Sequence, residues 1–378
     1  MPAKASSLIL LTPGFPENES DSTCLPWFQC FVRQLKSSFP CLKIIIVSLQ
    51  YPYQQKKYVW EGITVYAMGG RNRSGIAKRI LRYKVKQELD RLCKQESIAG
   101  ILSLWYGEAA RAAEMISVKY QFPHFCWIAG QDANQDNPFP AALKIPAERL
   151  IAVSDFIQEH FYHEHGIRPL HVIPFGPDEQ LYQSPPPEKD IDLLAVGSLI
   201  PLKQYSIFLE LVFAIKQSIP SVKAVLCGSG PEEASLQQRA ATLGLKDNIR
   251  FTGELPYPDV LQYMQRAKIF LHPSLYEGFG CVCTEALLAG AYVIRFTQPM
   301  KKNMLNSITV PSKLEMINQS LELLEQYTVP EPVNEYPVKA MTEKLGGLFG
   351  FHTAGNLQEP GSNGSGRQLF AEKIPAGS

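Results

Sequence analysis

The stretch that decides the fold covers residues 273–290 and reads PSLYEGFGCVCTEALLAG. It lies between two apolar runs, IFLHPS at 269–274 and AYVIRF at 291–296, so the pattern predicts a strand, a loop, a short helix and a second strand. We expect the helix to begin near Gly280 and to end before Gly290, because glycine favours the left-handed conformation that closes a helix. The free amides of its first turn would then lie above the strand ends, which is a typical anion site.

Two carboxylates lie eight positions apart in this stretch, Glu277 in the loop and Glu285 in the expected first turn of the helix. A carboxylate accepts hydrogen bonds from the hydroxyls of a sugar, and Gly278 and Gly280 allow a ligand to approach the backbone closely. Each acid alone has a simpler explanation, because an acid near a helix N-terminus stabilises the helix and a loop acid is solvated. Together with the glycines, the two acids indicate a ligand site.

Short apolar runs alternate with amphipathic segments through most of the chain. The other apolar runs lie at 7–14, 43–49, 100–105, 124–130, 149–154, 170–176, 192–199, 223–230 and 249–255. Each run ends in a polar or glycine turn, which is typical of a buried parallel strand. Strands that alternate with helices predict an α/β fold of doubly wound sheets, whose ligands bind at the carboxyl ends of the strands.

A proline-rich segment without apolar periodicity, 176–190, interrupts this alternation and is interpreted as a linker. We therefore predict two Rossmann-like domains of five or six strands each, 1–175 and 191–330, that face each other across a cleft. A last helix within 331–350 is expected to return towards the first domain. The segment 351–378 is rich in Gly, Ser, Asn and Pro and is predicted to be disordered.

Composition excludes several classes of protein. A formal net charge of +1 with 19% charged residues gives no reason to expect nucleic acid as a partner. The apolar run at 8–11 is too short for a signal peptide or a membrane span, and the eight cysteines form no CxxC pair. We expect a cytoplasmic protein with reduced thiols.

Patterns for metal or dinucleotide binding are weak. Asp190 and Asp192 have the spacing of a metal-binding acid pair, but they precede a strand instead of ending one, so we interpret them as solvated. His160 and His163 lie about one helical turn apart without an evident third ligand. Glu233 stands where the third glycine of a dinucleotide fingerprint would lie. We therefore expect neither a metal nor a dinucleotide cofactor.

One local charge asymmetry lies at 71–94, where basic residues far outnumber acids. At about 100° per residue, one helical face carries a stripe that suits the domain core, Leu81, Val85, Leu89 and Leu92. A second stripe of Ile76, Ile80 and Tyr83 falls nearly opposite. Among basic residues it indicates contact with an anionic membrane surface or with a lipid-linked or anionic acceptor. The alternative is a solvated basic face whose apolar residues are covered by a neighbouring loop.

The motifs of the second half resemble a known family. Glu277-Gly278-Phe279-Gly280 and Glu285-Ala286-Leu287 match the E-x7-E signature of family 4, the retaining nucleotide-sugar glycosyltransferases of the GT-B fold, also called glycosyl transferases group 1. VGSLIPLKQ at 196–204 is similar to that family's glycine-containing strand end and basic pair, and VIPFGPD at 172–178 to its interdomain hinge. The likeness is strong from about residue 151 to about residue 294 and only topological before that.

The resemblance implies that the second domain binds the donor and the first presents the acceptor. Glu277 would contact the hydroxyls of the donor sugar, Glu285 the ribose, and Lys203 the diphosphate, with Glu277 and Lys203 as the catalytic residues. The other donor-binding residues implied are Ser198, Gly228, Gly230, Leu255, Gly278, Phe279, Gly280 and Cys281. On the acceptor or sugar side we assign Gly14, Gly69, Gly70, Arg71, Gly130, Gln131 and Asp132.

The sequence departs from the family at two places. Ser198 stands where many relatives carry an arginine that shares the diphosphate, and WIAGQD at 127–132 lacks their cleft histidine, which leaves open whether Gln131 or Asp132 replaces it. We expect a retaining, metal-independent hexosyltransferase of glycan or glycoconjugate biosynthesis, with a glycan, lipid-linked or small-molecule acceptor. It would be cytoplasmic, with a peripheral position at the inner face of the membrane. The alternatives are a catalytically weak, transferase-like binding subunit and a GT-B glycoside phosphorylase.

Overall fold

The first strand, β1 (Ser6–Gly14), lies inside an eight-stranded sheet in the computed structural model, which describes residues 6–351. The sheet order is β3 (Lys56–Trp60), β4 (Ile63–Ala67), β2 (Lys43–Tyr51), β1, β5 (Ser97–Leu104), β6 (His124–Ile128), β7 (Leu150–Ala152) and β8 (His171–Val172). All neighbours are parallel except β3 and β4. The predicted buried runs form the parallel strands because both faces of the sheet are covered.

The prediction of five or six strands is wrong for this first sheet. The antiparallel hairpin of β3 and β4 adds strands at one edge, and its two-residue turn consists of Glu61 and Gly62. Both turn residues have positive φ, 47° and 77°, the geometry that matches the twist of the flanking strands. Exposed and half-buried residues alternate along β3, and only Trp60 at its end is buried, so the strand lacks the continuous apolar run of a buried strand.

Helices cover both faces of the first sheet. One face packs against α1 (Pro26–Ser38), α5 (Asp155–His165) and α11 (Val338–Leu348), and the other against α2 (Gly75–Gln95) and α3 (Glu108–Tyr120). The short helix α4 (Phe139–Leu143) follows β6. The predicted core stripe of α2 is confirmed, since Leu81, Val85, Leu89 and Leu92 are its buried residues.

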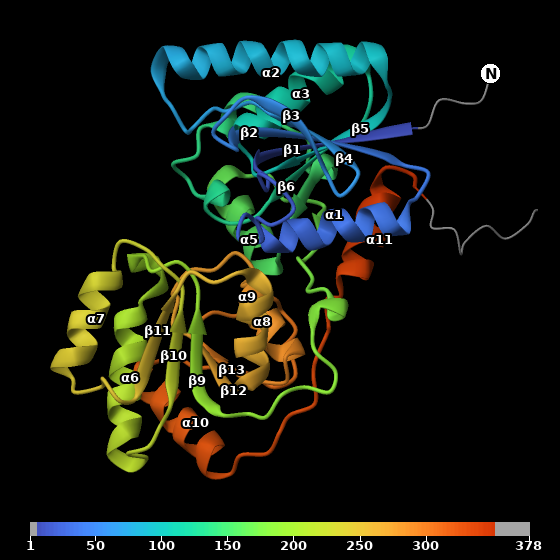
Figure 1. Cartoon of the computed structure of the whole chain (residues 1–378). Coiled ribbons are helices and arrows are strands. Elements are labelled where there is room, and N and C mark those ends of the chain that lie inside the picture. The colour runs from blue at the N-terminus through green and yellow to red at the C-terminus, as the bar shows by residue number, and fades with distance from the viewer. Residues whose placement is uncertain (1–5, 352–378) are drawn as a thin grey trace, which may run out of the picture.

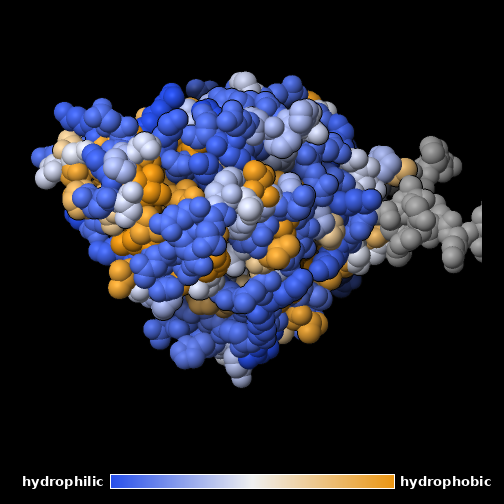
Figure 2. Space-filling model, turned by 90° about the horizontal axis from the view of Figure 1, so that it is seen from below, coloured by the Kyte–Doolittle hydropathy of each residue, from blue (hydrophilic) through white to orange (hydrophobic). Residues whose placement is uncertain are grey.

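The second sheet has six parallel strands. Its order is β11 (Ile249–Gly253), β10 (Ala224–Cys227), β9 (Ile191–Val196), β12 (Ala267–His272), β13 (Tyr292–Arg295) and β14 (Ser307–Thr309). One face packs against α6 (Tyr205–Ser218), α7 (Glu233–Thr242) and α10 (Lys313–Glu325), and the other against α8 (Tyr257–Arg266) and α9 (Cys281–Leu288). Seen from below, the molecule is largely hydrophilic, with apolar side chains in small groups (Figure 2).

The chain crosses between the domains twice, and the two crossings contact each other (Figure 1). The amide of Val338 donates to the carbonyl of Pro177 over 3.2 Å. A Cβ at Gly176 would lie 2.2 Å from the carbonyl oxygen of Tyr336, so only glycine fits at this contact. After the second crossing, α11 packs against α1, where Gly346 lies against the ring of Phe39.

Two further sequence predictions concern the ends and the membrane. The predicted disorder of the C-terminal segment lies outside the described residues, apart from Phe351, whose ring lies 5.8 Å from that of Phe39. Within residues 6–351, none of the helices combines the length and hydropathy that a membrane span requires.

Candidate functional site

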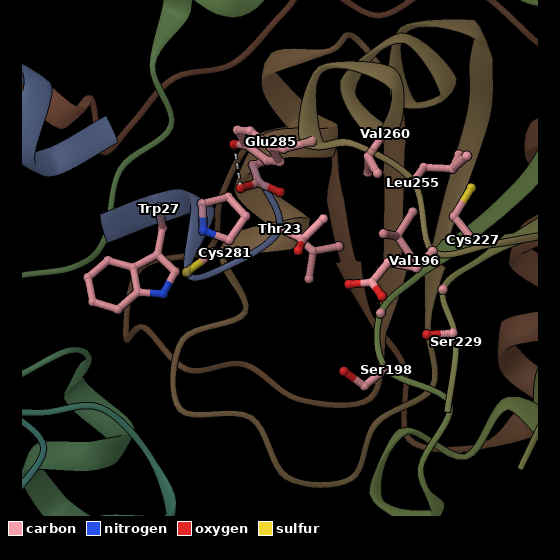
Figure 3. A pocket seen from close by; sticks show the side chains of 16 residues that line it. Thr23, Trp27, Val196, Ser198, Cys227, Ser229, Leu255, Val260, Cys281 and Glu285 are labelled. Atoms are coloured by element: carbon pink, nitrogen blue, oxygen red, sulfur yellow. Dashed lines mark hydrogen bonds between the residues drawn. The ribbon is translucent and has the colours of Figure 1, made fainter. Parts of the chain in front are cut away.

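A cavity of about 300 Å³ opens at the carboxyl ends of β9, β10 and β11. The second domain supplies most of its wall, and Thr23, Pro26 and Trp27 of the first domain supply the rest. In Figure 3, Trp27 and Cys281 lie on one side of the cavity, and Leu255, Cys227 and Ser229 lie on the other. The strand ends of a doubly wound sheet thus form a pocket against the opposite domain, where ligands of such sheets bind.

Five of the predicted donor-binding residues line this cavity. They are Ser198, Gly228, Leu255, Cys281 and Glu285. The glycines bring the strand ends close together, because a Cβ at Gly228 would lie 2.0 Å from the carbonyl oxygen of Gly197. A Cβ at Gly230 would lie 2.5 Å from the carbonyl oxygen of Leu199.

Glu285 lies in the second turn of α9, and not in the first as predicted, because the helix begins at Cys281. Its side chain is buried, with 8% of the residue exposed. The hydroxyl of Tyr257 donates to its Oε1 over 2.8 Å, drawn as the dashed line in Figure 3. Burial raises the pKa of Glu285 to about 7, against the opposite effect of the Tyr257 hydrogen bond. The carboxyl therefore changes its charge near neutral pH.

Glu277 has the opposite electrostatic environment. Nζ of Lys203 lies 2.5 Å from its Oε2, and Nε2 of the buried His272 donates to the same oxygen over 3.1 Å. Burial alone would raise the pKa of Glu277, but the hydrogen bond from His272 and the charge of Lys203 outweigh it and lower the pKa to about 2. Glu277 is therefore ionised at neutral pH.

The structure brings Glu277 and Lys203 together from distant parts of the chain. Lys203 ends a short 3₁₀ helix, Pro201–Lys203, that follows β9. Glu277 lies in the loop between β12 and α9. Gly280 is the N-cap of α9 with φ of 79°, a conformation that glycine adopts without strain.

The loop that carries Glu277 rests directly on the first domain. A Cβ at Gly278 would lie 2.0 Å from the carbonyl oxygen of Ala129. The hydroxyl of Ser154 donates to the carbonyl of Gly278 over 2.5 Å, and the hydroxyl of Tyr276 donates to that of Gly130 over 3.0 Å. The two domains are therefore in contact beside the Lys203–Glu277 pair.

Phe279 is placed differently from a ligand-binding side chain. Its ring is buried, with 2% of the residue exposed, and lies 5.6 Å from the ring of Tyr336. Only the backbone of Phe279 is therefore available to a donor.

On the acceptor side, Asp132 has a structural role. Its carboxylate accepts hydrogen bonds from the amides of Tyr106, Ala129 and Gly130, over 2.8, 3.1 and 2.8 Å. Burial raises the pKa of Asp132, although these amides act in the opposite direction. Gln131 is exposed, so it is the better placed of the two predicted residues to contact a ligand.

None of the predicted acceptor-side residues lines the cavity. Gly14 lies against Cys24 and Tyr51, while Gly69 and Gly70 pack on the backbone of residues 49–55. Nε of Arg71 donates to the carbonyl of Tyr53 over 2.8 Å. These four residues therefore lie together near the end of β2. They do not belong to the segment 129–132, which contacts the second domain.

Sequence reasoning missed two aromatic residues of the cavity. Tyr257 follows Pro256, and its proline-flanked helix start gives no sign of a partner for Glu285. Trp27 comes from the opposite domain and stacks on Phe175 with ring centroids 3.7 Å apart. Local sequence carries no signal for such contacts. Within residues 6–351, no three His, Cys, Asp or Glu side chains gather as a metal site.

Comparison with known proteins relates the second domain to glycosyltransferases. Residues 178–306 match the family model of glycosyl transferases group 1. The gpi3 subunit of phosphatidylinositol N-acetylglucosaminyltransferase from Schizosaccharomyces pombe is 33% identical over 127 residues, which are 32% of this chain and 28% of that protein. The 2-deoxystreptamine N-acetyl-D-glucosaminyltransferase of Niallia circulans is 28% identical over 102 residues, 27% of this chain and 26% of that protein. The chain thus spans about a quarter of the length of these relatives.

A solved structure shares the two-domain architecture. The crystal structure of Anabaena HepE in complex with UDP and glucose matches with a TM-score of 0.65 at 19% identity, covering 90% of this chain and 98% of that chain. The fold is GT-B. In this GT-B chain, all predicted donor-binding residues lie inside the segment that matches the family model, and all predicted acceptor-side residues lie outside it.

Proposed function

We propose that this protein is a retaining glycosyltransferase that moves a hexosyl group from a nucleotide-sugar to a hydroxyl of an acceptor, without a metal ion. The observation that carries the proposal is the cavity at the ends of β9 to β11, with the buried Glu285 in its wall. The matched family model and the UDP-bound structure of HepE support the same function. The product would belong to glycan or glycoconjugate biosynthesis.

In this proposal, each donor group has its own partner. The carboxyl oxygens of Glu285 accept hydrogen bonds from the ribose hydroxyls, and the backbone near Leu255 meets the base. Lys203 and the first amides of α9 face the diphosphate, whose negative charge a cation and a helix N-terminus stabilise. Glu277 accepts hydrogen bonds from the donor sugar, because its low pKa keeps it ionised.

The reaction breaks the bond between the anomeric carbon and the diphosphate oxygen. The acceptor oxygen attacks from the same face, and its proton passes to the departing phosphate, so configuration is retained. Lys203 stabilises the charge that grows on the leaving group. The contacts of Gly278 with Ala129 and Ser154 support a closed arrangement that excludes water from the reaction.

The acceptor is proposed only by class, as a hydroxyl of a glycan, a lipid-linked sugar or a small molecule. The names of the relatives include a phosphatidylinositol N-acetylglucosaminyltransferase and a 2-deoxystreptamine N-acetyl-D-glucosaminyltransferase, whose acceptors differ in chemistry. A peripheral position at the inner face of the membrane is part of the proposal. The surface that would hold the protein there is described in the next subsection.

Thermal unfolding with nucleotides tests the donor site. A ligand that binds only the folded protein raises the unfolding midpoint, so UDP, GDP, ADP and their sugars are each added without metal. We expect one nucleotide to raise the midpoint of the wild type but not of Glu285→Ala or Lys203→Ala. Lys268→Ala is the matched control, because Lys268 forms its own ion pair with Asp192 outside the cavity. No shift with any nucleotide at saturating concentration contradicts the proposal.

Product analysis tests the stereochemistry. We expect the anomeric configuration of the product, read from the proton coupling constants by NMR, to equal that of the donor. An inverted product contradicts the retaining mechanism but does not contradict the proposed donor site.

The second candidate is a binding subunit with weak catalysis. It is favoured by Ser198 in place of an arginine and by the use of Asp132 to bind backbone amides. A protein that binds a nucleotide-sugar but neither hydrolyses nor transfers it would support this candidate. Turnover that requires inorganic phosphate would instead indicate a glycoside phosphorylase.

A further inference from the structure

An apolar stripe on α2 is exposed on the outside of the first domain. Ile76 is 76% exposed, Ile80 51% and Tyr83 61%. The alternative that a neighbouring loop covers Ile80 and Tyr83 is therefore wrong. The stripe lies opposite the buried face of the same helix, and α2 runs along the side of the first domain that faces away from the second (Figure 1). Nothing within residues 6–351 buries these three side chains.

The acids near this helix are already paired. Glu108 binds Lys78 and Arg82, Glu88 binds Arg91, and Asp90 binds Lys119. By contrast, no ion pair within residues 6–351 includes Arg73, Arg79, Lys86 or Lys94. Of these four, only the charge of Lys86 acts on a nearby acid in the described part of the chain, Asp90. The exposed side of α2 therefore carries an excess of positive charge in a chain whose formal net charge is only +1.

The cations flank the stripe on both sides. At about 100° per residue, Arg79 and Lys86 fall on one side of it and Lys84 on the other. Long basic side chains in such positions rest their methylene groups on the apolar surface and extend their charges outwards. Tyrosine combines an apolar ring with a polar tip, which suits a boundary between water and hydrocarbon.

We propose that α2 binds the negatively charged surface of a lipid bilayer. A helix with a narrow apolar stripe between cations lies in the plane of a membrane, with its apolar side chains among the acyl chains and its cations at the anionic head groups. A protein partner would need an acidic surface with a matching apolar groove, whereas an anionic bilayer presents negative head groups and hydrocarbon together along the whole helix. This inference deepens the proposed function by naming a partner, but it does not need a working donor site.

Vesicle sedimentation of the full chain tests this surface. The probes are vesicles of phosphatidylcholine alone and of phosphatidylcholine with phosphatidylserine, each at low and at raised salt. We expect binding to the anionic vesicles only, weakened by salt because screening reduces the attraction. Arg79→Gln with Lys86→Gln should weaken binding about 30-fold, from roughly five-fold for each cation. Ile76→Gln with Ile80→Gln should weaken it as well.

Matched controls keep the test specific. Lys246→Gln with Lys339→Gln changes net charge equally at two exposed lysines outside α2. Leu314→Gln with Val329→Gln removes apolar side chains that are 66% and 67% exposed in the second half of the chain. Both controls should bind vesicles like the wild type. All variants should keep the nucleotide-dependent rise of the unfolding midpoint, which separates this inference from the proposed function.

Two outcomes would overturn the inference. One is a wild type that binds anionic vesicles no better than neutral ones, which would leave the stripe to a protein partner. The other is a set of α2 variants that bind anionic vesicles as tightly as the control variants, which would assign the binding to another surface.

Discussion

The hydroxyl of Ser154 in the first domain donates a hydrogen bond to the carbonyl oxygen of Gly278 in the second, over 2.5 Å. Ser154 also caps α5, since its Oγ accepts from the amide of Ile157. One side chain thus joins a helix start of one domain to the loop beside Glu277 in the other. This hydrogen bond and the contact of Gly278 with Ala129 hold the loop of Glu277 against the first domain. The position of Glu277 therefore depends on how the two domains close.

Gly278→Ala should separate the domains. The new Cβ would lie 2.0 Å from the carbonyl oxygen of Ala129, and a backbone atom yields only if the domains move apart. We expect a larger radius of gyration in X-ray scattering and a loss of transfer of about 100-fold, the usual effect of a small misplacement of reacting groups. Gly107→Ala is the control, because its Cβ meets nothing within 4 Å. Unchanged scattering and transfer in Gly278→Ala would show that this contact does not control closure.

The Lys203–Glu277 pair should be strongly coupled in folding. Lys203→Met leaves a largely buried carboxylate, 19% exposed, without its cation, which costs about 3 kcal/mol of unfolding free energy. Adding Glu277→Gln should recover part of this loss, with a coupling energy of about 1 to 3 kcal/mol in urea unfolding. The exposed pair of Arg168 and Glu159, whose side chains are 45% and 44% exposed, treated in the same way with Arg168→Met and Glu159→Gln, should give a much smaller coupling energy. Equal coupling in both pairs would contradict the argument from burial.

Stability should depend on pH through Glu285. Because burial raises the pKa of this carboxyl from an ordinary 4.5 to about 7, the folded protein holds a proton that the unfolded chain has already released. Glu285 therefore stabilises the fold below pH 4.5, and this contribution is lost as the pH rises to about 7. Glu285→Gln cannot ionise, so its stability relative to the wild type should rise by about 3 kcal/mol across this window.

Urea unfolding of the wild type and of Glu285→Gln at about pH 5 and about pH 8 measures this change in relative stability, because most of the titration lies between these two values. The control is Glu254→Gln, which removes an exposed carboxyl from the same cavity wall. A Glu285→Gln variant with the same pH dependence as the wild type would mean that Glu285 is ionised in the folded protein throughout this range.

Trp27 should contribute to nucleotide binding from the opposite domain. Its indole lines the cavity and is held by stacking on Phe175. Trp27→Ala removes this wall and should weaken the affinity for the nucleotide found by thermal unfolding about tenfold, which is ~1.4 kcal/mol. Trp27→Phe keeps an aromatic ring, so its affinity for the nucleotide should fall much less, as measured by isothermal titration calorimetry. Equal affinity of Trp27→Ala and the wild type would assign binding to the second domain alone.

Much of the fold could be predicted from local patterns. The run at 43–49 is apolar because β2 is buried on both faces, and the positions of α2 that face the core follow from its helical period. The hairpin of β3 and β4 could not be predicted in the same way. Its turn uses Glu61 where asparagine or aspartate is usual, and β3 is half-exposed.

The candidate site was predictable where its parts are close in sequence. Glu277, Gly280 and Glu285 surround a single helix start, and that start lies at the predicted position. The groups that complete the site come from elsewhere. Tyr257 is 28 residues from Glu285, Lys203 is 74 residues from Glu277, and Trp27 belongs to the other domain.

The sequence by itself determined two packed α/β domains and a loop–helix motif with two acids, because apolar periodicity and glycine positions act within a few residues. Only the tertiary structure decided the charge of those acids. Burial raises the pKa of Glu285 to about 7, while His272 and Lys203 lower that of Glu277 to about 2. Burial and ion pairing depend on residues that folding brings together, so two similar glutamates acquire opposite properties.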